Sequence, residues 1–248
     1  MSSDRRRLKE NLRRVHQRIA DACARARRDP ATVRFVAVTK TVEPDVIRMA
    51  MDLGIQDLGE NRIQQLTRRA AMIEESLSRI PPDQLAPSPR WHMVGRLQRN
   101  KVKAAIEVAD TIHSVDSLRL AEEISRRAHA LGKQMPCLLQ VNASGEGSKA
   151  GVPVAAAPYL AEQIVSLPGM RLTGLMTMGP LTEDLERVRI GFTAVRELFE
   201  EMQAQRTCGP AFSELSMGMS NDFEIAVEEG ATLLRIGRAL FEGLQSQT

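Results

Sequence analysis

Lys40 is the residue whose type and position are best suited to covalent chemistry. It follows the apolar run Phe35–Val38, which has the composition of a strand covered on both faces. An amine held among apolar walls is partly desolvated, and desolvation favours the neutral form that attacks carbonyl groups. Position alone leaves a second interpretation open, in which Lys40 simply reaches solvent at the end of a strand.

Two segments near the C-terminus could bind a phosphate group. The first, Ser216–Asp222, places Ser220 and a glycine just before an expected helix, and the second contains Gly237 and Arg238. Backbone N–H groups at such turns and helix starts bind anions. A serine before a helix is also an ordinary N-cap, and the acids that open this helix would repel an anion that they faced. Phosphate binding and plain capping therefore both remain open.

Strands and helices alternate along the chain, and this alternation must position the candidate residues. The expected strands are residues 34–39, 57–59, 91–94, 111–115, 137–141, 171–176, 214–216 and 232–236. The helices expected between them are 44–53, 63–80, 100–108, 117–131, 154–167, 183–205 and 222–229. An additional amphipathic helix, over about residues 4–29, precedes the first strand. Such alternation predicts an α/β fold with a parallel sheet and crossover helices.

Eight such units suit a closed (β/α)₈ barrel of the TIM type. A doubly wound open sheet is the structural alternative, but it usually carries a glycine-rich turn after its first strand, where this chain has Thr39-Lys40-Thr41. No linker or change of composition divides the sequence, so we expect one domain over residues 1–248. In a barrel, active sites form at the C-terminal ends of the strands, which places Lys40 and both phosphate segments at one mouth.

Composition argues against several classes of protein. The formal charge of +3 is too small for nucleic-acid binding, and the arginine clusters Arg5–Arg7 and Arg25–Arg28 are interleaved with acids, as in a solvated helix face. The apolar runs are too short to cross a membrane. Cys23, Cys137 and Cys208 show neither metal-ligand spacing nor a disulfide framework. We therefore expect a cytoplasmic protein without a metal site.

The motifs, in their order, resemble those of the pyridoxal phosphate homeostasis proteins, single-domain relatives of the barrel domain of alanine racemase. The resemblance covers residues 34–243, with small departures at Thr39, where the family most often has serine, and Gln65, where a glutamate is common. The segments that carry it are Ala37-Val-Thr-Lys40-Thr41, Gly59-Glu-Asn61, Trp91-His-Met-Val-Gly95-Arg-Leu-Gln-Arg-Asn100-Lys101, Ser148-Lys-Ala-Gly151, Gly174-Leu-Met176, Leu215-Ser-Met-Gly-Met-Ser220-Asn-Asp222 and Arg235-Ile-Gly237.

The resemblance implies that the chain binds pyridoxal 5′-phosphate. Lys40 would form a Schiff base with this cofactor. Arg235 would approach the pyridine nitrogen, keep it unprotonated and so weaken the cofactor as an electron sink. Ser220, Gly237 and Arg238 would contact the phosphate. The other residues expected near the cofactor are Asn61 and, as pocket walls, Met176 and Ser216.

In function, the resemblance implies a binding protein of intracellular vitamin B6 homeostasis, a monomer or weak homodimer, which could deliver its cofactor to apo-enzymes. The alternative is an amino-acid racemase or another enzyme of low activity that uses this cofactor. Alanine racemase draws its opposing base, a tyrosine, from a second domain. This chain ends soon after its eighth strand, and its one tyrosine, Tyr159, lies in an expected helix. Racemisation needs acid and base on opposite faces of the α-carbon, so we expect no catalytic residues. An adaptor built on an inactive barrel is a third class, which only the arginine-rich first helix favours.

Several residues have no assigned role. His92, beside Trp91, is predicted to be a hydrogen-bonded structural histidine, and His113 shows no ligand spacing. Methionines near the ends of the sixth and seventh strands are expected to pack as adaptable walls of the pocket. The basic segment Arg96–Lys103 could bind a second phosphate or a partner, or form a solvated face, and its role stays open.

Overall fold

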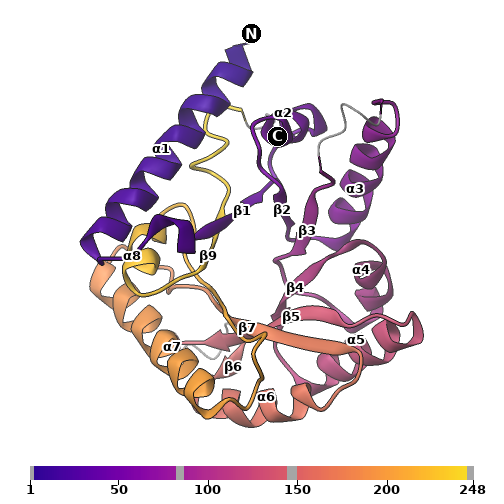
Figure 1. Ribbon diagram of the computed structural model, residues 1–248, viewed down its shortest axis with the longest axis vertical. Coiled ribbons are helices and arrows are strands. Elements are labelled where there is room, and N and C mark those ends of the chain that lie inside the picture. Colours follow the sequence, from indigo (N-terminus) through magenta and orange to yellow (C-terminus); the bar gives the residue numbers. More distant parts are fainter. Residues whose placement is uncertain (1–2, 82–86, 144–149, 245–248) are drawn as a thin grey trace.

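Eight parallel strands close into a barrel in the computed structural model, which describes residues 3–81, 87–143 and 150–244 (Figure 1). The strands are β1 (Arg34–Val38), β2 (Asp57–Glu60), β3 (Arg90–Met93), β4 (Thr111–Val115), β5 (Met135–Asn142), β7 (Met170–Thr177), β8 (Glu214–Ser216) and β9 (Leu233–Ile236). Their order is β4-β3-β2-β1-β9-β8-β7-β5, and pairing of β4 with β5 closes the ring. The predicted (β/α)₈ barrel is confirmed. A two-residue strand, β6 (Val152–Pro153), pairs with the end of β5 and was not predicted.

The helices lie outside the barrel (Figure 1). They are α1 (Ser3–Arg25), α2 (Pro44–Asp52), α3 (Ile63–Leu77), α4 (Val102–Val108), α5 (Leu118–Ala130), α6 (Ala157–Val165), α7 (Leu185–Gln205) and α8 (Phe223–Glu228). Short 3₁₀ turns cover Pro30–Thr32, Arg99–Lys101 and Val154–Ala156. Residues 82–86 lie outside the described residues, as do Ser148 and Lys149 of the motif Ser148-Lys-Ala-Gly151.

The extra helix α1 ends at Arg25, earlier than the expected position near residue 29. Arg27 adopts a positive φ of 54°, which a continuing α-helix does not allow. Asp29 then caps a 3₁₀ turn, its Oδ1 accepting from the Ala31 N–H at 2.9 Å. Because Pro30 cannot donate a backbone hydrogen bond, the chain leaves the helix here and enters β1.

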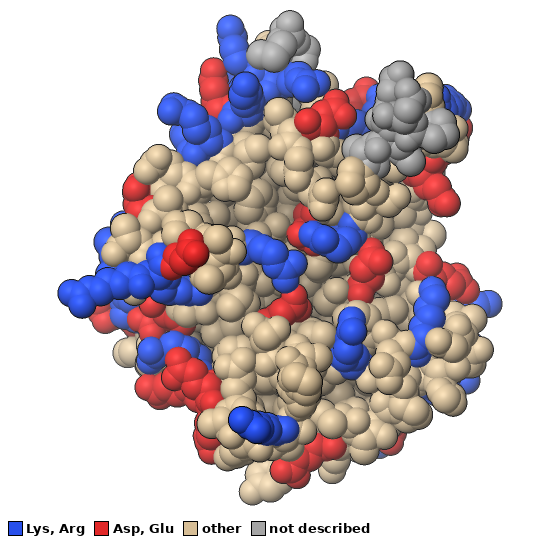
Figure 2. All heavy atoms as spheres, viewed as in Figure 1, with Lys and Arg blue, Asp and Glu red and all other residues tan. Residues whose placement is uncertain are grey.

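Helix α1 packs its apolar stripe against α8 and α2 (Figure 1). Its arginines are partly docking contacts rather than a wholly solvated face. Arg18 pairs with Glu224 at 3.0 Å and Arg25 with Glu228 at 2.6 Å. Just beyond the helix, Arg28 donates to the carbonyl oxygens of Val227 and Ala231. Over the face shown in Figure 2, basic and acidic side chains are interspersed, in keeping with the small net charge.

The barrel has two cores because successive side chains of a strand point to opposite faces. On β1, Phe35 contacts the ring of His16 on α1, so Phe35 and Ala37 face the helices. Val36 and Val38 therefore face the barrel interior, which also holds buried polar groups. These interior polar side chains are Asp57, His92, His113, Ser216 and Arg235.

Gly174 marks a point where two strands approach too closely for a side chain. The register between β5 and β7 shifts by one residue here, as at a β-bulge. A Cβ at Gly174 would lie 1.7 Å from the carbonyl oxygen of Glu214 on β8. Since that oxygen belongs to the backbone of a barrel strand, it can move only if the sheet moves.

We expect Gly174→Ala to lower the free energy of unfolding by about 1–3 kcal/mol, the usual cost of overpacking. Gly191→Ala is the matched control. It lies inside α7, where an added Cβ meets nothing closer than the Cδ of Pro180 at 3.8 Å. Its higher helix propensity should leave stability unchanged or raise it by up to about 1 kcal/mol. Urea denaturation of both variants measures the difference, and equal midpoints would contradict the steric argument.

Candidate functional site

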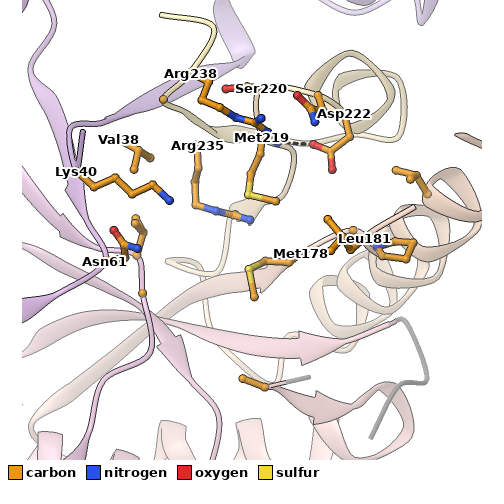
Figure 3. Close-up of a pocket in the computed structure, with 18 of the residues that line it drawn as sticks. Val38, Lys40, Asn61, Met178, Leu181, Met219, Ser220, Asp222, Arg235 and Arg238 are labelled. Carbon is orange, nitrogen blue, oxygen red and sulfur yellow. Dashed lines mark hydrogen bonds between the residues drawn. The ribbon is translucent and has the colours of Figure 1, made fainter. Parts of the chain in front are cut away.

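A cavity of about 400 Å³ lies at the barrel mouth, at the C-terminal ends of the strands (Figure 3). It contains six of the eight residues that the sequence placed near a cofactor. They are Lys40 after β1, Asn61 after β2, Ser220 after β8, Arg235 on β9, and Gly237 and Arg238 after β9. Because β1 pairs directly with β9, barrel closure brings the first and last of these segments together.

Lys40 extends from the end of β1 into the cavity, with Asn61 beside it (Figure 3). The Lys40 side chain is exposed, so the desolvation that its position suggested is not provided by the surrounding protein. The Oδ1 atom of Asn61 is buried and has no hydrogen-bond partner among the described residues. An unsatisfied buried acceptor is costly, so this atom suits a ligand that carries a donor.

A buried carboxylate holds the turn that carries Lys40. Glu60 is fully buried, accepts from the Thr39 hydroxyl at 2.5 Å and pairs with Arg69. Arg69 also donates to the carbonyl oxygens of Thr39 and Val42, both at 2.7 Å. The chain on both sides of Lys40 is thus fixed to β2 and α3. The sequence interpretation missed Arg69, because its place in a helix gave no sign that it reaches the barrel mouth.

Arg235 places a fixed positive charge at the cavity wall. It is 4% exposed, and its guanidinium donates to Ser216 Oγ at 2.7 Å and to the Thr177 carbonyl oxygen at 2.8 Å. Burial lowers the pKa of Arg235 to about 10, which leaves it charged at neutral pH. In Figure 3 its side chain and that of Lys40 point into the same space.

A chain of hydrogen bonds runs from Ser216 through the barrel interior to Asp57. His113 Nδ1 lies 3.2 Å from Ser216 Oγ, and His113 Nε2 lies 3.0 Å from His92 Nδ1. His92 Nε2 lies 2.9 Å from Asp57 Oδ1. Arg90 donates a hydrogen bond to each carboxylate oxygen of Asp57, both at 2.7 Å. His92 is therefore a hydrogen-bonded structural histidine in this structure, whereas the part played by His113 was not foreseen.

The carboxylate of Asp57 determines which atoms donate and which accept in this series of hydrogen bonds. Burial alone would raise the pKa of Asp57, but hydrogen bonds from Arg90 and His92 outweigh burial and hold that pKa well below its usual range. Burial, with the charges nearby, lowers the pKa of His113 well below its ordinary value. The Asp57 carboxylate can only accept, so His92 donates to it through Nε2; where His92 Nδ1 accepts, His113 donates at Nε2. Ser216 can then donate to His113 and still accept from Arg235.

The residues suggested for a phosphate group lie together at one side of the cavity (Figure 3). Ser220 Oγ accepts from the Ala239 N–H at 3.2 Å, so this serine ties the two loops together and does not cap α8. In the described part of the chain, the backbone N–H groups of Gly237 and Arg238 have no protein acceptor. A Cβ at Gly237 would lie 3.1 Å from the Val38 carbonyl oxygen, so glycine keeps this turn close to β1.

The charges of the described lining favour an anion. Lys40, Arg96, Arg235 and Arg238 face a single acid, Asp222. Burial raises the pKa of Asp222, and its Oδ1 accepts from the Met219 N–H at 2.5 Å, the dashed line in Figure 3. This carboxylate shapes the loop before α8. Apolar side chains complete the lining, among them Val38, Met178, Leu181 and Met219.

Met176 and Ser216 do not line the cavity, although the sequence placed them among its walls. Both are almost completely buried, and they occupy paired positions on β7 and β8. Ser216 lies in the barrel interior, where its Oγ accepts a hydrogen bond from Arg235. The exposed methionine walls are instead Met178 and Met219.

The described residues lack two kinds of feature. No group of three or more histidine, cysteine, aspartate or glutamate side chains among them could hold a metal ion. None of the helices they form is both long and apolar enough to cross a membrane.

Comparisons with known proteins agree with this geometry. The sequence matches the family described as "Alanine racemase, N-terminal domain" over residues 3–245. It is 41% identical over 232 residues to the pyridoxal phosphate homeostasis protein of Aquifex aeolicus, covering 94% of this chain and 96% of that protein.

Two solved structures are similar throughout. A protein of unknown function from Bifidobacterium adolescentis gives a TM-score of 0.89 at 39% identity, covering 97% of each chain. PipY of Synechococcus elongatus, solved with pyridoxal phosphate bound, gives a TM-score of 0.75 at 35% identity, covering 90% of this chain and 99% of PipY.

The buried His113 predicts acid sensitivity of the fold. Its pKa lies below its ordinary value of 6.5, so the unfolded chain takes up a proton that the folded chain resists. The contribution of neutral His113 to the free energy of unfolding is complete above about pH 6.5. It is lost as pH falls, by up to about 1.4 kcal/mol per pH unit. Urea denaturation between pH 7.5 and 5 should show this slope, and His113→Gln should reduce it. His129→Gln, at an exposed position, is the control, and an unchanged slope in His113→Gln would refute the assignment.

Proposed function

Since the chain belongs to the alanine racemase N-terminal domain family, and within it to the pyridoxal phosphate homeostasis proteins, we propose that it holds pyridoxal 5′-phosphate as a Schiff base on Lys40. One observation carries the proposal. A lysine amine, an unsatisfied buried acceptor and two backbone N–H groups without an acceptor share one cavity of about 400 Å³. An aldehyde, a hydrogen-bonding ring and a phosphate are the complementary groups of this cofactor.

When bound, the cofactor supplies the aldehyde carbon that a lysine amine attacks. Lys40 provides the amine from the end of β1. Ser220 and the N–H groups of Gly237 and Arg238 would bind the phosphate, with the Arg238 side chain adding charge. Met178 and Met219 provide apolar surface beside the cavity. The oxygen of Asn61 would accept a hydrogen bond from the ligand.

Arg235 favours retention of the cofactor over catalysis. A guanidinium facing the pyridine nitrogen disfavours its protonation, and an unprotonated ring is a weaker electron sink. Ser216 and Thr177 hold the guanidinium at the cavity wall, so this effect would be built into the fold.

The surroundings of Lys40 favour a carrier that delivers the cofactor to apo-enzymes. Racemisation needs proton-transfer groups on both faces of the substrate. Asp222 is the only acid, and there is no histidine, among the described side chains that line the cavity, and its carboxylate accepts a hydrogen bond from the Met219 N–H. Lys40 is exposed and Leu181 at the rim is 99% exposed, so a bound cofactor would remain accessible to a partner.

Absorbance spectroscopy tests the Schiff base. The protein mixed with pyridoxal 5′-phosphate should show a Schiff-base band that borohydride abolishes while fixing the label, and Lys40→Ala should lose both effects because it lacks the amine. The control is Lys133→Ala, which removes an exposed lysine far from the cavity lining. A band that survives in Lys40→Ala, or no band in the unaltered protein, would refute the assignment.

Incubation with L-alanine separates a carrier from a racemase. We expect no sustained formation of the D-isomer, whereas the loaded protein should restore activity to an apo-enzyme that needs this cofactor. The control for transfer is protein whose label has been fixed by borohydride, which should restore nothing. Continued D-alanine formation that disappears in Lys40→Ala would establish the enzyme instead.

A further inference from the structure

A second cavity of about 720 Å³ lies next to the first. It is formed by the segments that follow β2, β3 and β4, at the same end of the barrel. Asn61 and Arg96 line both cavities, so the two share a wall. The basic segment Arg96–Lys103, whose role the sequence left open, forms one side of it.

The wall of this second cavity is strongly basic. Arg62, Arg99, Lys101 and Arg119 line it together with Arg96, and Asp116 is the only acid among the described lining residues. Five cations therefore face one carboxylate, in a chain whose whole formal charge is +3. Concave walls lined by one sign of charge concentrate ions of the opposite sign.

Four of these five cations have no ion-pair partner in the part of the chain that the structure describes. Arg96 lies 3.9 Å from Asp116, at the limit of an ion pair, and the other four form no ion pair within the described ranges. On α5 itself, by contrast, Arg126 and Arg127 bind Glu123 at 2.6 and 2.8 Å. With Asp116 as the single acid of the described lining, most of these cations remain available to an external anion.

The floor of the cavity is apolar. Ile63, Leu97 and Leu120 line it and are 6%, 4% and 2% exposed. Arginine binds phosphate oxygens in a bidentate manner, and an apolar floor accepts the carbon skeleton of the same molecule. The combination fits a phosphorylated small molecule better than a bare inorganic ion.

We propose that this second cavity binds a small-molecule phosphate monoester, independently of whether Lys40 holds a cofactor. The ester places its phosphate among Arg62, Arg99, Lys101 and Arg119, and its organic part against Leu97 and Leu120. Because the shared residues Asn61 and Arg96 join the two cavities, a phosphorylated ligand here is a neighbour of the Lys40 site.

Phenyl phosphate is a suitable probe, read out by backbone amide NMR of the full chain. We expect saturable shifts at Ser117–Leu120, distinct from any shifts at Ser220 and Gly237 in the first cavity. The double variant Arg99→Gln/Arg119→Gln should weaken the response at Ser117–Leu120 by about tenfold or more, since it removes two charge-assisted hydrogen bonds. Phenol, which lacks the phosphate, should give no such response.

The matched control is Arg126→Gln, which removes one cation from the exposed face of α5 and should leave the affinity unchanged. If Arg126→Gln weakens binding as much as Arg99→Gln/Arg119→Gln does, long-range charge explains the result and the site is refuted. Displacement of phenyl phosphate by equimolar chloride would refute it too, as would an absence of shifts at Ser117–Leu120. Loss of the Lys40 Schiff base with intact binding here would refute only the proposed function.

Discussion

The buried charge of Arg235 is the constraint on which the interior of this barrel depends. An ion in a protein interior is tolerated only when every nearby dipole is arranged to compensate for lost hydration. Ser216 and the Thr177 carbonyl oxygen supply that compensation. The Ser216 hydroxyl in turn needs an acceptor, which is His113. His113 contacts His92, and His92 contacts the carboxylate of Asp57, where this series of hydrogen bonds ends. Residues of β2, β3, β4, β7, β8 and β9 are thereby fixed to one another.

Closure of the barrel allows the N-terminal and C-terminal segments to build one site. Lys40 is held from the side of β2 and α3, through Glu60 and Arg69. The opposite side of the cavity is held by the bond between Ser220 and the Ala239 N–H. The two halves meet because β1 and β9 are neighbours, so neither half would form the cavity alone. Support from both sides holds the lysine and the buried cation at fixed separations.

The distribution of charge at the mouth distinguishes two neighbouring environments. Around Lys40 the cations share the cavity wall with apolar surface from Met178 and Met219, which suits a planar ring. Around Arg119 most of the cations are exposed and lack an ion-pair partner among the described residues. The proposed cofactor site and the proposed phosphate-ester site therefore differ in how their charges are compensated, although Asn61 and Arg96 line both.

Much of this architecture could be read from the sequence, because strand and helix patterns are local. Alternating apolar runs and helical stripes predicted eight units, and all eight strands appear within two residues of their expected limits. The rule that parallel strands end at one mouth then placed Lys40, Ser220 and Gly237 together. The departures are equally informative. The sequence placed Met176 in the pocket wall, whereas the wall is formed by Met178, two residues later. A sequence pattern locates the end of a strand more reliably than it locates the last side chain that reaches solvent.

The sequence by itself therefore determined the fold class, the order of the elements and the residues at the strand ends. Only the tertiary structure decided which side chains touch across the barrel. His92 and His113 lie 21 residues apart, and Ser216 is 103 residues beyond His113, so their contacts depend on strand register and closure. The same holds for Arg69 beneath Lys40 and for the second cavity. Local propensity fixes what each segment becomes, whereas the pairing of distant polar groups is set by the packing of the whole barrel.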